Sequence, residues 1–174
     1  MRALIGALAA TLFLPAIASA QTQPAPPTCA AAEHRALDFW VGKWDAYRAD
    51  TNALAGRSSI RMEDAGCVIT EHWTSLNAPY TGRSLNFYDR HSGRWEQFWV
   101  DSQGGRMHFI GGVIDGGVQM TSAPTIPAAG GAALYSRVTF TAQADGSVLQ
   151  RGETSADGQA WTLAYAFIYR RRAE

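Results

Sequence analysis

The segment RSLNFYDRHSGRWEQFWVD, residues 83–101, carries the clearest fold signal in this chain. Polar and apolar side chains alternate on both sides of its centre, which is typical of half-buried β-strands. The central DRHSG segment has the composition of a tight turn. If residues 90–93 form a four-residue loop, the two halves pair as an antiparallel hairpin with Asp89 opposite Arg94.

This register divides the hairpin into two faces. One face carries Ser84, Asn86, Tyr88, Trp95, Gln97 and Trp99. The other face carries Arg83, Leu85, Phe87, Glu96, Phe98 and Val100. Both faces mix polar and apolar side chains, so hydropathy alone leaves open which face is inside, and a one-residue bulge in the turn would shift the pairing.

The rest of the chain continues the same pattern of short alternating runs separated by turn residues. We expect strands at residues 43–49, 57–62, 67–74, 83–89, 94–101, 107–115, 118–121, 134–141, 147–154 and 161–171. The short connections favour antiparallel neighbours, and an up-and-down meander of about ten strands favours closure into a barrel, because closure removes exposed edges. A β-sandwich is the alternative. Residues 30–39 favour a short N-terminal helix, and residues 122–133 form a long loop, either a tolerated insertion or a lid.

The composition excludes several classes of protein. The chain has 174 residues with 15 basic and 15 acidic side chains, 47% hydrophobic residues and 17% charged residues. A disordered chain has lower hydrophobicity and a larger net charge. A protein that binds nucleic acid through bulk electrostatics needs an excess of basic residues, so we expect no nucleic-acid partner.

The N-terminal part has the features of a secretory signal peptide. Residues 1–20 begin with Met-Arg, continue with an apolar run and end in Ala-Ser-Ala. Residues 21–28 form a Pro-rich linker, which leaves residues 29–174 as one domain. No later segment reaches the length of a membrane helix, so we expect a periplasmic or secreted protein without a membrane span.

Both cysteines, Cys29 and Cys67, lie in the part that follows the predicted signal peptide. An even number of cysteines in an exported chain favours a disulfide. A metal pair and a nucleophile are the alternatives. The chain has no Cys-x-x-Cys motif and no histidine at the spacing of a metal site, which makes both less favoured than the disulfide.

Three segments resemble a known family. They are FWVGKW at residues 39–44, GCVITEHW at residues 66–73 and the hairpin at residues 82–101. Together they are similar to a family of exported bacterial proteins of unknown function, described as lipocalin-like β-barrels. The resemblance implies a calycin-type barrel, a Cys29–Cys67 disulfide and no established enzymatic activity.

The resemblance also implies which residues face the interior. It places the Ser84 face of the hairpin toward the lumen, with Glu71 and Trp73 beside it. In lipocalins a tryptophan of a Gly-x-Trp motif closes one end of the barrel beneath an arginine of the last strand. Trp44 with Arg170, or with the adjacent Arg171, would form this structural plug.

A lumen of this kind has the composition of a small-molecule site, with aromatic walls and a few polar groups. The candidate ligand-binding residues are Glu71, Trp73, Ser84, Asn86, Tyr88, Trp95, Gln97 and Trp99. The alternative is a filled barrel whose interior polar groups only satisfy one another.

Catalysis is a second possibility. Glu71 and Asp101 are candidates for a general acid and base, because a buried carboxyl beside aromatic rings has a raised pKa. The alternative for both residues is a salt bridge to Arg106, Arg137 or Arg151, or a position at the solvent-exposed rim.

The four histidines form no metal-binding motif, so we expect no metal and no cofactor. Haem stays open, since other barrels hold it through a single histidine, and His108 would be the ligand if its side chain pointed inward.

The sequence therefore predicts an exported, lipocalin-like barrel that binds a small apolar or aromatic molecule. An enzyme on the same barrel that uses Glu71 as general acid or base is the second hypothesis. A filled barrel that associates with other proteins through its outer face is the third.

Overall fold

The computed structural model describes residues 29–127 and 129–172. The predicted signal peptide at residues 1–20 and the predicted linker at residues 21–28 lie outside this part of the chain. Among the described residues, no helix has both the length and the apolar character needed to cross a membrane.

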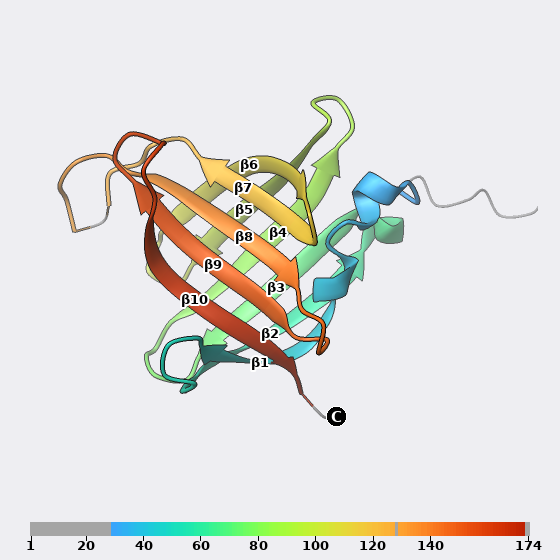
Figure 1. Ribbon diagram of the computed structural model, residues 1–174, viewed down its shortest axis with the longest axis horizontal. Coiled ribbons are helices and arrows are strands. Elements are labelled where there is room, and N and C mark those ends of the chain that lie inside the picture. The colour runs from blue at the N-terminus through green and yellow to red at the C-terminus, as the bar shows by residue number, and fades with distance from the viewer. Residues whose placement is uncertain (1–28, 128, 173–174) are drawn as a thin grey trace, which may run out of the picture.

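The described chain folds into ten antiparallel strands that close into one barrel (Figure 1). The strands are β1 (Gly42–Arg48), β2 (Leu54–Glu63), β3 (Val68–Ser75), β4 (Thr81–Asp89), β5 (Arg94–Asp101), β6 (Arg106–Ile114), β7 (Gly117–Ser122), β8 (Tyr135–Ala142), β9 (Val148–Ser155) and β10 (Thr162–Arg171). Each strand pairs with the next one in sequence, and β10 pairs with β1 to complete the ring. This confirms the predicted all-β, up-and-down barrel over the alternative of a sandwich.

The β4–β5 hairpin has the predicted register. Asp89 lies opposite Arg94, and Asn86 lies opposite Gln97. The face that carries Ser84, Asn86 and Gln97 is buried, whereas on the opposite face Leu85 and Val100 remain 51% and 55% exposed. The polar face of the hairpin is therefore the inner face, which hydropathy left undecided.

The chain before β1 seals one end of the barrel, where the blue segment lies across the strand ends (Figure 1). It forms two 3₁₀ segments, η1 (Ala32–Arg35) and η2 (Asp38–Trp40), where the sequence predicts one short helix over residues 30–39. Leu37 and Trp40 are completely buried, and the Trp40 ring centroid lies 4.4 Å from that of Phe140. These side chains fill the sealed end of the interior.

A disulfide between Cys29 and Cys67 fastens the start of this capping segment to the barrel. Cys67 directly follows η3 (Asp64–Gly66) and precedes β3, so the bond joins the segment to the β2–β3 turn. The predicted disulfide is confirmed.

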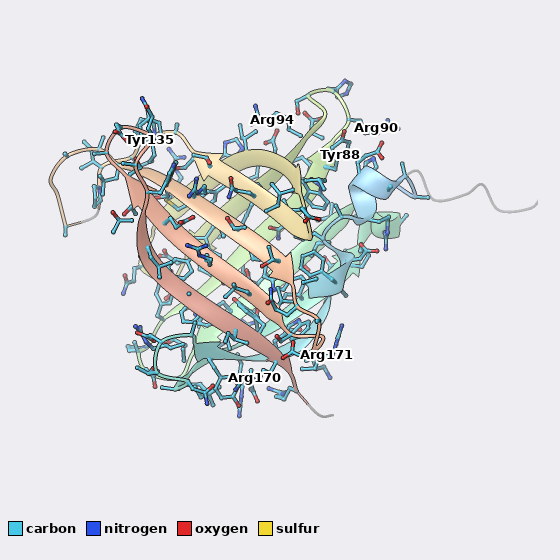
Figure 2. The ribbon with its side chains drawn as sticks, viewed as in Figure 1. Tyr88, Arg90, Arg94, Tyr135, Arg170 and Arg171 are labelled. Atoms are coloured by element: carbon cyan, nitrogen blue, oxygen red, sulfur yellow. A yellow bond between two sulfur atoms is a disulfide. The ribbon has the colours of Figure 1, made fainter. Side chains whose placement is uncertain are left out.

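Arg171, rather than Arg170, covers the tryptophan at this end. Its guanidinium carbon lies 4.5 Å from the centroid of the Trp44 ring, and its Nη1 donates a hydrogen bond to the Val41 carbonyl oxygen. Arg170 lies over Tyr47 instead. The strand register explains why Arg171 covers Trp44. Trp44 pairs with Arg171, whereas the next pair, Asp45 and Arg170, points to the opposite face of the sheet. Figure 2 shows both arginines near the end of β10.

The opposite end of the barrel carries most of the longer loops. The β7–β8 connection is the longest of them and projects beyond the strand ends in Figure 1. It corresponds to the loop predicted at residues 122–133, and a single bridge between Thr125 and Leu134 joins its two sides. A barrel sealed at one end therefore has its interior accessible only from the loop end, within the described residues.

Candidate ligand-binding cavity

A cavity of about 750 Å³ occupies the loop end of the barrel interior. Seven aromatic side chains form much of its wall: Trp73, Tyr80, Trp99, Phe109, Tyr165, Phe167 and Tyr169. Its lining extends from rim residues such as Ile126 of the β7–β8 loop down to Glu71 and Tyr169. The volume is in the range of small-molecule sites.

Three of the aromatic rings lie directly over glycines of a neighbouring strand. A Cβ atom added to Gly82 would collide with the Trp99 ring, and one added to Gly152 would collide with the Tyr165 ring. Gly56 provides the same space for Trp73. Because no side chain occupies these positions, each ring packs against the barrel wall and the space in front of it stays open.

Glu71 lies at the floor of the cavity and is only 4% exposed. Its Oε1 accepts a hydrogen bond of 2.8 Å from the Ser58 hydroxyl, and its Oε2 accepts one of 3.2 Å from the Ser84 hydroxyl. Both serines sit on the neighbouring strands, because Glu71 of β3 lies between β2 and β4. The carboxyl group is thus held in one orientation.

A chain of hydrogen bonds connects the cavity wall to this carboxyl group. Gln97 donates from Nε2 to Asn86 Oδ1 at 2.6 Å, and Asn86 donates from Nδ2 to Ser84 Oγ at 2.9 Å. Ser84 in turn donates to Glu71. Asn86 and Gln97 face each other across the hairpin, so one hydrogen bond joins their amides inside the barrel, and the Asn86 NH2 group also donates to the Ile69 carbonyl oxygen.

Burial raises the pKa of Glu71 from 4.5, the ordinary value, to about 7, although hydrogen bonds from Ser58 and Ser84 and the nearby hydroxyl of Tyr169 act to lower it. No ion pair within the described part of the chain includes Glu71. The salt bridge from Glu71 to Arg106, Arg137 or Arg151, which the sequence left open, is therefore absent. A carboxyl with such a pKa exchanges its proton near neutral pH.

Tyr169 stands beside this carboxyl on β10. Its hydroxyl donates a hydrogen bond of 2.7 Å to Gln150 Oε1. Burial raises the pKa of Tyr169 well above its ordinary value, and the charge of Glu71 raises it further. The phenol is therefore neutral at physiological pH.

Asp101 belongs to the rim rather than to the floor. It accepts backbone hydrogen bonds of 2.9 Å from both Gln103 and Gly105, and its Oδ2 lies 3.3 Å from the Tyr80 hydroxyl. Desolvation is the largest single influence and acts to raise the pKa of Asp101. The hydrogen bonds from Gly105, Gln103, Tyr80 and Trp99 together outweigh it, so the pKa lies below its ordinary value. Asp101 shapes the β5–β6 turn.

The strand register separates Asp101 from Glu71. Glu71 of β3 pairs with Ser84 of β4, and Asp101 of β5 pairs with Gly82 of β4. Asp101 therefore lies two strands away from Glu71 and is offset from it by two residues along the strands. Standard strand spacings then place the two Cα atoms roughly 11 Å apart. The two carboxyls do not form the joint acid–base pair that the sequence suggested.

The other predicted site residues occupy different depths of the barrel. Glu71, Trp73, Gln97 and Trp99 line the cavity, and Ser84 and Asn86 lie behind them in the hydrogen-bond chain. The other two, Tyr88 and Trp95, share the inner face but lie near the sealed end.

At that end Trp95 Nε1 donates to the Glu33 carbonyl oxygen at 2.9 Å, and the Tyr88 ring lies 4.9 Å from that of His34. Figure 2 shows Tyr88 beside the N-terminal segment. These two residues hold the capping segment and do not line the cavity.

Sequence reasoning did not select three aromatic residues of β10. Tyr165, Phe167 and Tyr169 all line the cavity. They alternate along the strand, and this period-two pattern was the signal that pointed to a common face. On one side β10 pairs with β1, at the other end of the sequence, and on the other side a register shift between Leu163 and Tyr165 interrupts its pairing with β9, so local alternation did not reveal their orientation.

His108 does not meet the condition for a haem ligand in the interior. It pairs with Phe98 on the outer face of β5, and its ring stacks on Phe98 at a centroid distance of 4.0 Å. Its Nε2 lies 2.8 Å from Glu96 Oε2. Among the described residues, no group of three or more His, Cys, Asp and Glu side chains is arranged to hold a metal ion.

Comparison with known proteins adds no assignment: no protein-family model matches this chain, and no curated protein matches it.

Proposed function

We propose that this chain is an exported, lipocalin-like barrel that binds a small, largely apolar or aromatic molecule. The aromatic cavity at the loop end of the barrel carries the proposal. Its rings offer apolar area and stacking surfaces, and Gln97 and Glu71 offer polar groups at the far end of the same space. A filled barrel would have side chains in this volume.

Export is supported by two features. Residues 1–20 have the pattern of a signal peptide, and disulfides form and persist mainly in oxidising compartments. The resemblance of the FWVGKW and GCVITEHW segments to exported bacterial barrels of unknown function points to the same periplasmic or secreted location.

An enzymatic role for the same cavity is the second candidate. The pKa of Glu71, about 7, is suited to a general acid or base near neutral pH. Turnover of a bound ligand that is lost in Glu71→Gln would favour this role over binding alone.

Native mass spectrometry of the mature, disulfide-bonded protein tests the proposed function, together with an ultraviolet–visible spectrum. We expect a fraction of the protein to carry a small molecule from the expression host. The variant Ser75→Trp should abolish this adduct, because Ser75 lines the cavity and the added indole fills it.

Thr74→Trp is the matched control, since side chains alternate along β3 and Thr74 does not line the cavity. An adduct that persists in Ser75→Trp, or that is lost equally in both variants, would contradict binding in the cavity.

A further inference from the structure

The charges around the cavity are distributed unevenly along its depth. The arginines that line it are Arg48, Arg106 and Arg137, all near the loop end of their strands. Arg48 is paired with Asp50 at 2.8 Å, and Arg137 is paired with Glu153 at 2.9 Å. The deep end has no such cation among the described residues.

The groups that surround Glu71 are polar or aromatic. Ser58 of β2 and Ser84 of β4 donate hydrogen bonds to it, and Tyr169 of β10 faces it. Apart from the three arginines at the loop end, the other titratable groups that line the cavity are Tyr80, Tyr165, Asp101 and Glu153. None of these four can carry a positive charge, so the deep end of the cavity provides no counter-ion for the ionised carboxylate.

Aromatic rings border the same space. Trp73 lies two residues beyond Glu71 on the same face of β3, and its ring lies 5.4 Å from Phe167 and 6.3 Å from Tyr169 between centroids. The faces of such rings carry partial negative charge and attract cations in desolvated sites. Rings and carboxylate together form an electronegative recess.

We propose that the ligand is an organic cation, an amine with an aromatic or alkyl body, whose ammonium group binds Glu71 at the floor of the cavity. The body of the amine then fills the aromatic part of the cavity above it. This inference rests on the proposed function, because it specifies the class of molecule that the same cavity takes.

The energetic reason is the unpaired carboxylate. An ionised carboxylate in an apolar interior is costly without a counter-ion, and an ammonium group provides both the opposite charge and hydrogen-bond donors. An anionic ligand would meet the like charge of Glu71 and find no cation at the floor. A neutral ligand would leave the carboxylate uncompensated.

Binding is coupled to a proton. In the empty cavity the carboxyl of Glu71 is largely protonated below about pH 7. When an ammonium ion binds, the carboxyl loses its proton to solvent and the O⁻···H–N⁺ pair forms. The neighbouring tyrosines stay neutral, because burial raises the pKa of Tyr80, Tyr165 and Tyr169.

Titration calorimetry with three probes of similar size tests the inference on the mature protein. The probes are 2-phenylethylamine, the neutral 2-phenylethanol and the anion phenylacetate. At about pH 8, we expect the amine to bind at least about tenfold more tightly than the alcohol, equivalent to about 1.4 kcal/mol, and phenylacetate to bind more weakly than either.

The variant Glu71→Gln should reduce this preference for the amine to about onefold while the alcohol still binds, which shows that the cavity is intact. Gln retains an oxygen that can accept the Ser58 and Ser84 hydrogen bonds. Glu96→Gln is the control, because Glu96 is a carboxylate on the outer face beside His108. It should leave the tenfold preference unchanged.

Proton release provides a test that needs no variant. At about pH 6, calorimetry in buffers of different ionisation enthalpy should show close to one proton released per amine bound. Equal affinity for amine and alcohol, or amine binding without proton release, would overturn the inference and leave the proposed function standing. If none of the three probes binds, the proposed function fails as well.

Discussion

The carboxyl group of Glu71 is a buried acid in a barrel whose ion pairs, among the described residues, all lie elsewhere. Two serine hydroxyls and a chain of amides orient it, yet they do not compensate fully for desolvation, so its pKa rises to about 7. A carboxyl whose pKa is higher in the folded protein than in the unfolded chain lowers the free energy of unfolding at any pH where the unfolded chain is ionised.

We therefore expect a pH dependence of stability that Glu71→Gln removes. Below about pH 4.5 the carboxyl is protonated in both states. As the pH rises, the unfolded chain ionises first, so the free energy of unfolding falls until about pH 7 and then levels off. The total loss is on the order of 3 kcal/mol, at about 1.4 kcal/mol for each tenfold change in protonation constant.

Urea unfolding of the wild type and of Glu71→Gln between about pH 4.5 and 8 measures this difference directly. Relative to the wild type, the variant should gain stability as the pH rises. A constant difference between the two proteins across that range would show that Glu71 titrates as it does in the unfolded chain.

The glycines beneath the aromatic rings give a second prediction at this scale. In Gly82→Ala the new Cβ atom collides with the Trp99 ring, so the ring must move toward the cavity. We expect a loss of about 1–3 kcal/mol in unfolding free energy, as for other overpacked sites, and a changed tryptophan fluorescence spectrum. Gly112→Ala is the control, because a Cβ atom there meets no neighbour. Equal effects of the two substitutions would contradict this packing.

At the scale of elements, the hairpin and the capping segment differ in what determines them. The β4–β5 hairpin follows from its own residues, since alternation and the turn composition predict the register that the structure has. The capping segment depends on the rest of the barrel. Its two 3₁₀ segments are held by Trp40 against Phe140, by Trp95 and by the disulfide to Cys67.

The disulfide should therefore matter for stability more than for ligand binding. It joins residues 38 positions apart, and the chain-entropy model gives about 4 kcal/mol for a loop of this length. We expect Cys29→Ser combined with Cys67→Ser to lower the free energy of unfolding by up to this amount. The double variant should still bind 2-phenylethylamine under conditions where it is folded, because the disulfide lies at the sealed end of the barrel. Loss of binding in a folded variant would show that capping also shapes the cavity.

At the scale of the whole molecule, closure between β1 and β10 converts ten strands into a container. Closure makes one face of every strand interior, and the capping segment seals one end of that interior with Leu37 and Trp40. The remaining volume at the loop end is the cavity. The candidate site is thus a consequence of the complete ring rather than of any single strand or motif.

Features that depend on neighbours along the chain could be predicted from the residues alone. These are the strands, their turns, the hairpin register and the number of strands that favoured a barrel. They were predictable because alternation and turn composition are local properties. The Cys29–Cys67 disulfide was the favoured choice because the chain has two cysteines and no metal-binding motif.

The closed barrel was needed to establish which face of the hairpin is inside and where each inner residue lies along the barrel. Asn86 and Gln97 are stable inside because their amides bond to each other, whereas hydropathy treats each residue alone. Glu71 has its partners on β2, β4 and β10, and its pKa depends on all of them. Burial and electrostatics sum over groups that are distant in sequence, so they become defined only when the barrel closes.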